Sequence, residues 1–157
     1  MLIFKMANYK RIFLNNYSYF ITIVMHGRNP ILIENIKLLR QSFRVSKNKY
    51  DYKIEAIVIL PDHIHMIIKP KIAKEYPHII RTIKQYFSKH CEKHYYAHLE
   101  QSNSRWKEGY KPIWQKKYYE HAIRNEKDFI EKAGYMYYNP VKHGLVNSPE
   151  EWEYSSF

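Results

Sequence analysis

Two histidines that are separated by a single residue, His63 and His65, form the first pattern in this sequence that could perform chemistry. They open a segment, residues 63–69, whose isoleucine-rich composition predicts a β-strand. Side chains two residues apart in a strand point to the same face, so both imidazoles could bind one divalent metal ion. Two strand histidines without a ligand fit the same pattern, and a catalytic metal usually needs a third protein ligand.

A tyrosine and an asparagine near the end of the chain are the candidates for a nucleophile and a third ligand. Residues 126–138 predict a helix that Asn125 caps and Pro140 stops. Tyr135 and Asn139 are four residues apart, so they share one side of this helix. That side lies nearly opposite an apolar side made by Phe129, Ile130, Ala133, Met136 and Tyr137. A phenol is a possible nucleophile and an amide oxygen is a hard metal ligand, but a surface tyrosine beside a helix-ending asparagine fits equally.

The other predicted elements describe the scaffold that must position these groups. Strands are predicted over residues 17–26, 53–60, 63–69 and 112–121, helices over 30–47 and 76–99, and a loop over 100–111. The order β-α-β-β-α-β-α predicts an α+β protein with a ferredoxin-like split βαβ, an antiparallel four-stranded sheet and an added C-terminal helix. We expect helices on one face of the sheet, above Ile64, Met66 and Ile68, and the two histidines on an open face.

The composition indicates a polyanionic partner. The 157 residues include 26 Lys and Arg against 15 Asp and Glu, a net charge of +11, and 16 tyrosines. Basic charge with many aromatic rings is typical of single-stranded nucleic-acid binding, although a merely basic protein fits the charge alone. We expect one domain over residues 1–157.

The single cysteine, Cys91, excludes an internal disulfide and favours a cytoplasmic location. No apolar run is long enough for a transmembrane helix. The first six residues are too short and too soon interrupted by charge for a secretory signal, and Met6 is an alternative start.

Several strings resemble a known family. Leu60-Pro61-Asp62-His63-Ile64-His65 resembles the HUH motif of single-tyrosine transposases. Later strings resemble one branch, the REP-associated tyrosine transposases; they are Trp114-Gln115, the string from Tyr119 to Asn125, the string Tyr135-Met136-Tyr137-Tyr138-Asn139-Pro140-Val141-Lys142-His143-Gly144, and the string from Trp152 to Phe157. The resemblance runs from about residue 8 to the end of the chain, and its ordered motifs are more specific together than any one alone.

This resemblance implies a ferredoxin-like fold and a DNA transposase that acts on hairpin-containing single-stranded DNA. It assigns Tyr135, rather than Tyr138, as the nucleophile that forms a 5′-phosphotyrosine. It also implies His63, His65 and Asn139 as ligands of Mg²⁺ or Mn²⁺. Because each chain has one such tyrosine, two simultaneous cleavages need two chains, so we expect a monomer or a homodimer.

Two positions depart from the family pattern, and both bear on how well the protein would work. Position 134 is glycine, directly before the nucleophile, which would loosen the helix by about 1 kcal/mol relative to alanine. The chain stops at Phe157, where similar proteins often continue, and a shorter tail would weaken hairpin recognition.

Further candidates for DNA contact lie on the second helix and the fourth strand. They are Arg81, Lys84, Gln115, Lys117, Tyr119 and His121. Ordinary strand packing and a solvated helix face are the alternatives for these residues.

Other sites and functions also fit parts of the sequence. His90, His94 and His98 recur every four residues and could form a second metal site on one helix. A non-catalytic, single-stranded nucleic-acid-binding module of the same fold would use the aromatic residues but leaves the histidine pair unexplained. A metal-dependent hydrolytic nuclease would need an activated water and usually more carboxylates near the metal.

Overall fold

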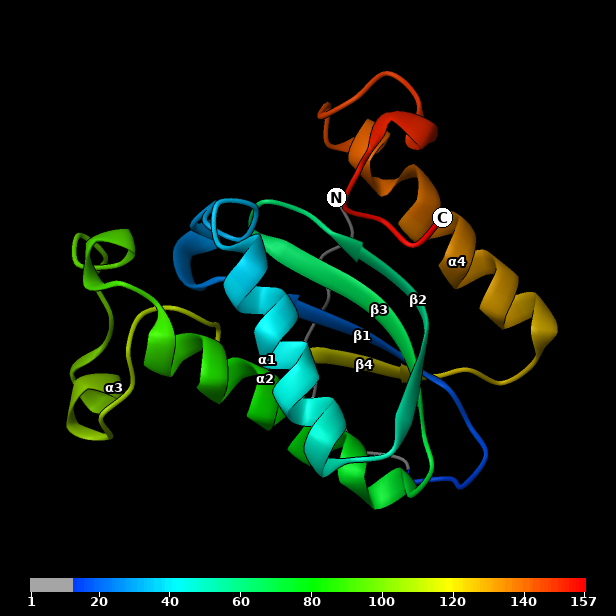
Figure 1. The fold of residues 1–157 in the computed structure, drawn as a ribbon, viewed down its shortest axis with the longest axis horizontal. Coiled ribbons are helices and arrows are strands. Elements are labelled where there is room, and N and C mark those ends of the chain that lie inside the picture. The colour runs from blue at the N-terminus through cyan, green and yellow to red at the C-terminus, as the bar shows by residue number, and fades with distance from the viewer. Residues whose placement is uncertain (1–12) are drawn as a thin grey trace.

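The computed structural model, which describes residues 13–157, contains a four-stranded antiparallel sheet with helices packed on both faces (Figure 1). The strands are β1 (Tyr19–Val24), β2 (Tyr52–Ile59), β3 (His63–Pro70) and β4 (Tyr119–Ala122), in the spatial order β2-β3-β1-β4. This arrangement confirms the predicted ferredoxin-like split βαβ. Residues 1–12, with Met6 and the start of the expected domain, lie outside the described residues.

Helices α1 (Ile36–Lys49) and α2 (Tyr76–His90) cover one face of the sheet (Figure 1). In the strands, every second residue is apolar and points toward these helices. This alternation is the pattern of a half-buried strand. Ile64, Met66 and Ile68 of β3 are fully buried in this layer, as predicted.

Helix α4 (Glu126–Lys142) packs on the opposite face. The prediction that this face is open is therefore wrong. Its Met136 is fully buried together with apolar residues of the three neighbouring strands. The buried residues from the sheet are Phe20, Ala56, Val58 and Ile67. Their apolar surface must be removed from water, and α4 does so.

The predicted apolar side of α4 is only partly the side that packs. Ile130 is 61% exposed, and the Tyr137 hydroxyl donates a hydrogen bond to Glu150 near the surface. Asn139, by contrast, is fully buried. The helix is rotated so that Met136 and Asn139 face the sheet and Ile130 faces the solvent.

Both earlier helices are shorter than predicted. Helix α1 begins at Ile36 and not at residue 30, because the Asn29 side chain donates to the Tyr95 carbonyl at 2.8 Å instead of capping a helix. Helix α2 ends at His90, where the backbone of Cys91 becomes extended. The predicted loop over residues 100–111 contains a short helix, α3 (Asn103–Lys107).

The last strand and the last helix also differ in length from the prediction. Strand β4 covers only Tyr119–Ala122, although Trp114 makes an isolated bridge to Met25. Helix α4 continues through Pro140 to Lys142. A proline removes one backbone donor, and the last turn is still closed by the bond from the His143 amide to the Asn139 carbonyl at 3.0 Å. The predicted cap is confirmed, since the Asn125 side chain accepts from the Asp128 amide at 2.9 Å.

The C-terminal segment lies along β2 and helps to hold α4 in place. The Ile59 amide donates to the Tyr154 carbonyl at 2.8 Å, and the Ser156 amide donates to the Ile57 carbonyl at 2.9 Å. The Trp152 indole donates to the Ile59 carbonyl at 2.9 Å. Within residues 13–157, none of the helices has the length and apolar character needed to cross a membrane.

Candidate active site

His63 and His65 open strand β3 and point to the face that α4 covers. Their rings lie edge to face with centroids 4.8 Å apart, and both side chains are buried. The predicted shared orientation of the two imidazoles is therefore present. Their environment is more enclosed than an open sheet would provide.

A hydrogen bond holds one nitrogen of each imidazole. Nδ1 of His63 lies 2.6 Å from Oδ1 of Asp62, whose other oxygen is 3.6 Å from the Arg28 guanidinium. Nδ1 of His65 lies 2.7 Å from the Thr22 hydroxyl. When each Nδ1 donates, the lone pair of each ring is on Nε2, as in histidines that bind metals.

Tyr135 on α4 stands beside His65. The two ring centroids are 5.3 Å apart, and the Tyr135 ring is also edge-on to Phe20 at 6.3 Å. The ammonium of Lys142 lies 5.1 Å from the centre of the Tyr135 ring. The helix therefore brings a phenol, flanked by a cation, to the histidine pair.

Asn139 lies on the same side of α4, one turn after Tyr135 and one turn before His143. The His143 ring is 5.1 Å from the His63 ring, so the contacts on either side of Asn139 are made with the histidine pair. Neither Oδ1 nor Nδ2 of Asn139 has a hydrogen-bond partner among the described residues, and the same is true of Nε2 of His65. Buried polar atoms are normally satisfied, so these atoms indicate a place for a ligand.

The electrostatics of the site favour neutral His65 and His143 and an ionised Asp62. Burial lowers the pKa of His65 well below its ordinary value, and the positive charge of His63 acts in the same direction. Burial also lowers the pKa of His143, again with a contribution from His63. Burial raises the pKa of Asp62, but the hydrogen bond and charge of His63 and the charge of Arg28 outweigh it and leave that pKa lowered.

These residues suit a hard divalent cation with open coordination positions. The amide oxygen is a hard ligand of the type that suits Mg²⁺ and Mn²⁺, whereas imidazole nitrogen is a common ligand of divalent transition metals. The buried atoms of His65 and Asn139 without hydrogen-bond partners are donors of these two types. No group of three or more His, Cys, Asp and Glu side chains within residues 13–157 could hold a metal ion. The donor set expected from the sequence therefore includes the amide of Asn139 as its third member.

The prediction of a second metal site from the repeated histidines is wrong. His90 is the last residue of α2, and His94 lies in a separate short turn, Lys93–Tyr95. The periodicity of a continuous helix, which would have aligned these residues with His98, is therefore absent.

The six candidate DNA contacts separate into different regions. Arg81, Lys84 and Gln115 line one hollow beside α2, and Lys117 is exposed. Tyr119 and His121 lie on β4 near α4, where Nε2 of His121 is 2.7 Å from Asp128. Gln115 and Lys117, predicted to belong to a strand over residues 112–121, lie outside it, because β4 begins only at Tyr119.

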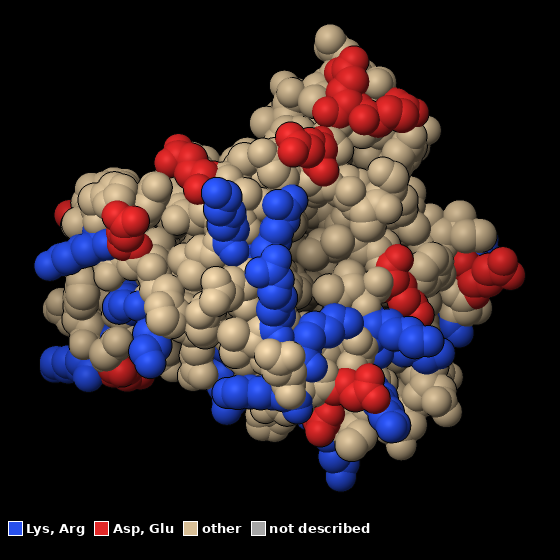
Figure 2. All heavy atoms as spheres, in the orientation of Figure 1, with Lys and Arg blue, Asp and Glu red and all other residues tan. Residues whose placement is uncertain are grey.

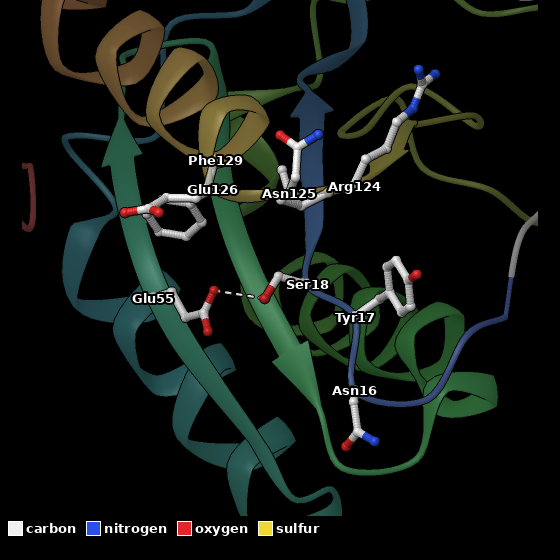
Figure 3. A pocket seen from close by; sticks show the side chains of 9 residues that line it. Asn16, Tyr17, Ser18, Glu55, Arg124, Asn125, Glu126 and Phe129 are labelled. Atoms are coloured by element: carbon white, nitrogen blue, oxygen red, sulfur yellow. Dashed lines mark hydrogen bonds between the residues drawn. The ribbon is translucent and has the colours of Figure 1, made fainter.

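Another hollow, of about 650 Å³, lies under the beginning of α4 (Figure 3). In it the hydroxyl of Ser18, the residue just before β1, donates to Glu55 of β2 at 2.7 Å, near Phe129 of α4. None of the histidines lines this hollow. It is therefore separate from the place where the nucleophile and ligand candidates meet.

Sequence reasoning missed several residues of the site. Thr22 could have been found only from the register of β1 against β3, in which it is opposite His65. Arg28 adopts a left-handed backbone conformation after Gly27. No local sequence pattern predicts this conformation. Lys142 and His143 stand in a quoted motif, but only the continuation of α4 beyond Pro140 places them beside Tyr135 and His63.

Comparison with known proteins points in one direction. The family described as "Transposase IS200 like" matches residues 13–132, which include both histidines but end before Tyr135. A candidate REP-associated tyrosine transposase of Haemophilus influenzae is 36% identical over 97% of this chain and 86% of its own length. The REP-associated tyrosine transposase of Escherichia coli strain K12 is 32% identical over 97% of this chain and 83% of its own.

A solved structure is similar over almost the whole chain. It is that of a REP-associated tyrosine transposase bound to a REP hairpin, and it superposes with a TM-score of 0.80 at 32% sequence identity. The match covers 97% of this chain and 83% of that one. The fold and the sequence similarity thus agree.

Proposed function

This chain belongs to the IS200-like transposase family, among the REP-associated tyrosine transposases, and we propose that it cleaves and rejoins hairpin-associated single-stranded DNA through a 5′-phosphotyrosine. The observation that carries the proposal is the position of Tyr135, whose ring lies 5.3 Å from that of His65. A REP hairpin is bound by the similar solved transposase, and DNA of that kind is the substrate class proposed here.

His63, His65 and Asn139 would hold Mg²⁺ or Mn²⁺ through Nε2, Nε2 and Oδ1. Such a cation, when bound, polarises the phosphate that is to be cleaved. Asp62 and Thr22 keep the two imidazoles in the orientation and tautomer that this requires. The low pKa of His65 supports the role, because a ligand nitrogen must be unprotonated.

Tyr135 is the residue that forms the covalent bond. Its phenol oxygen attacks phosphorus and gives up its proton, and the bond from phosphorus to the 3′ oxygen breaks. The products are a 5′-phosphotyrosine and a 3′ hydroxyl, which receives a proton. A second 3′ hydroxyl reverses these steps and restores the DNA backbone without hydrolysis.

Lys142 is suited to stabilise the tyrosine during rejoining. Its ammonium faces the Tyr135 ring at 5.1 Å. A cation in this place interacts more strongly with a phenolate than with a neutral phenol. We therefore assign Lys142 to the stabilisation of the departing phenolate.

A covalent-capture assay tests the proposal. Purified protein is incubated with single-stranded DNA that carries a palindrome flanking its own gene, with Mg²⁺, with Mn²⁺ or with chelator. We expect a denaturation-resistant protein–DNA adduct that needs the metal ion, and Tyr135→Phe should abolish it while DNA binding persists. Tyr138→Phe is the matched control, because Tyr138 is 61% exposed and its ring packs against Tyr137.

The alternatives give different products in the same assay. An adduct that persists in Tyr135→Phe would overturn the assignment of the nucleophile. Free 5′-phosphate without an adduct would indicate a hydrolytic nuclease. Bound DNA without cleavage, under both metals and with either flank, would indicate a non-catalytic binding module.

A further inference from the structure

A strongly basic hollow lies between α2 and the segment that follows α3, away from the residues assigned to chemistry. Its volume is about 670 Å³. The cations that line it are Arg81, Lys84, Lys89, Arg105, Lys111 and Lys116, and Glu108 is the single carboxylate in the lining. Figure 2 shows Lys and Arg side chains over the region where α2 and α3 lie in Figure 1. Such an excess of positive charge in a concave surface attracts a polyanion.

Hydrogen bonds to backbone carbonyls hold the wall of this hollow in place. Nζ of Lys84 donates to the Gln115 carbonyl at 2.9 Å, and the Arg105 guanidinium donates to the Trp114 carbonyl at 2.9 Å. Lys111 donates to the Ser88 carbonyl at 2.9 Å and so joins the segment to α2. Burial, reinforced by the charge of Arg105, lowers the pKa of Lys84 to about 8. An anion in the hollow would relieve that unfavourable charge.

The hollow also offers an aromatic surface. Tyr110 is 46% exposed, and its ring centre lies 5.6 Å from the Arg105 guanidinium and 5.7 Å from the Lys116 ammonium. An exposed ring beside two cations can stack on a base while the cations contact the adjoining phosphates. The volume matches a site for one small ligand, which corresponds to a single nucleotide unit and not to a duplex.

The hollow is close to the histidine pair through the sheet. The Gln115 amide donates to the Val24 carbonyl at 2.9 Å, and Val24 is paired with His63. Gln115 is therefore two strand spacings from His63, or about 10 Å between backbones. DNA that leaves the active site past this edge of the sheet would reach the hollow within a few nucleotides.

We propose that this basic hollow binds a nucleotide of the single-stranded DNA that flanks the hairpin, with the base on Tyr110 and the phosphates on the surrounding cations. The inference rests on the proposed function for the identity of the DNA. It adds a binding site on the α2 side of the sheet, separate from the phosphate that is cleaved.

The test compares the binding of two DNA probes to the full chain. One probe is a hairpin with single-stranded flanks on both sides, and the other is the same hairpin with blunt ends. Arg81, Lys89 and Lys116 are exposed, so they are changed together to glutamine. A single nucleotide unit is flanked by two phosphates. Because this variant lacks the exposed cations that would neutralise them, the slope of log K against log salt should become shallower by about 1.4, and the flanked probe should bind about tenfold more weakly at low salt. Binding of the blunt hairpin should be unchanged.

A matched variant separates the hollow from overall charge. Lys37, Arg40 and Arg44 are exposed on α1, and their change to glutamine removes the same three charges outside the hollow. Equal losses in the two triple variants, or an equal loss for flanked and blunt hairpins, would overturn the proposal. Tyr110→Ala should weaken binding of the flanked probe by about tenfold, and Tyr110→Phe should restore it.

The outcome can be separated from that of the catalytic proposal. A photoreactive base in the flank should crosslink to Tyr110, and mass spectrometry would locate the bond whether or not an adduct forms on Tyr135. A crosslink at Tyr110 without any adduct would support the hollow and reject the transposition chemistry. An adduct on Tyr135, together with a triple variant that binds the flanked probe as well as the parent does, would support the transposition chemistry and reject the proposed role of the hollow.

Discussion

At the scale of single residues, the site depends on which nitrogen of each imidazole is already engaged. Thr22 and Asp62 each occupy an Nδ1, at 2.7 Å and 2.6 Å, and Nε2 of His65 has no partner among the described residues. Thr22 contacts His65 from the neighbouring strand β1. Among the described residues, the Thr22 side chain makes no hydrogen bond to Tyr135 or Asn139. It is a positioning residue in the proposed reaction.

Thr22→Val should weaken binding of Mn²⁺ by about 10- to 100-fold, because the His65 ring loses the partner that fixes its tautomer. Titration calorimetry with Mn²⁺ alone measures this without reference to activity. Thr22→Ser keeps the hydroxyl and should bind Mn²⁺ nearly as well as the parent. Unchanged affinity in Thr22→Val would show that the hydroxyl does not orient the ring.

At the scale of elements, α4 decides whether the nucleophile meets the histidines. Met136 fixes the helix on the sheet, Asn125 caps it, and Asp128 ties its first turn to β4 through His121. Because Tyr135 and Asn139 are both held by α4, the stability of this helix and the geometry of the site are linked.

Gly134→Ala should stabilise the protein by about 0.5–1 kcal/mol, because glycine weakens a helix interior and a methyl group here would meet no atom within 4 Å. Urea denaturation measures the change. Lower stability would contradict the helix as described. A stable variant that forms the Tyr135 adduct only at much higher DNA concentration would instead show that DNA approaches the backbone at this glycine.

Asp128→Asn should lower stability at neutral pH by about 1–3 kcal/mol, since the carboxylate accepts from the Arg124 amide, His121 and Lys132. Burial raises the pKa of Asp128, but these hydrogen bonds and the charge of His121 lower it to about 2, against an ordinary 3.8. The contribution of ionised Asp128 to the free energy of unfolding is therefore complete above about pH 4 and is lost as the pH falls toward 2.

Urea titrations from pH 7 down to pH 3 of the parent and of Asp128→Asn check this dependence. The difference between the two should stay constant to about pH 4 and then narrow. Asp51→Asn is the control, because Asp51 is 75% exposed and its pair with Lys71 at 3.6 Å should contribute little. A difference that grows as the pH falls would contradict the lowered pKa.

At the scale of the whole molecule, the net charge of +11 is spread unevenly. Basic residues gather over α1, α2 and α3, whereas acidic residues cluster around the turn Pro149–Glu151 beyond α4 (Figure 2). The basic region of this face includes the hollow beside α2, and such a region attracts a polyanion.

If about six phosphates are neutralised, log K for single-stranded DNA should fall with log salt at a slope near −4. Fluorescence anisotropy over a range of salt concentrations measures the slope. A flat response would show that the basic surface does not contact DNA phosphates. Because the hollow would neutralise about two of these six phosphates, the triple variant should retain about two thirds of the slope.

Features that depend on local periodicity could be predicted from the amino-acid sequence alone. The alternation around Ile64, Met66 and Ile68 placed His63 and His65 on one face, and the four-residue spacing placed Tyr135 and Asn139 on one side of a helix. These relations follow from the geometry of the strand and the helix, which is the same in every chain. The order of the elements, and with it the fold, was predictable for the same reason.

Only the tertiary structure decided how the elements face one another. The rotation of α4, the partnership of Thr22 with His65 and the end of α2 at His90 each depend on residues distant in the chain. Register and helix rotation are set by which apolar surfaces are buried together, and burial joins segments that have no local pattern in common. For this reason the histidines could be predicted from the sequence, whereas the enclosure around them and the basic hollow beside α2 could not.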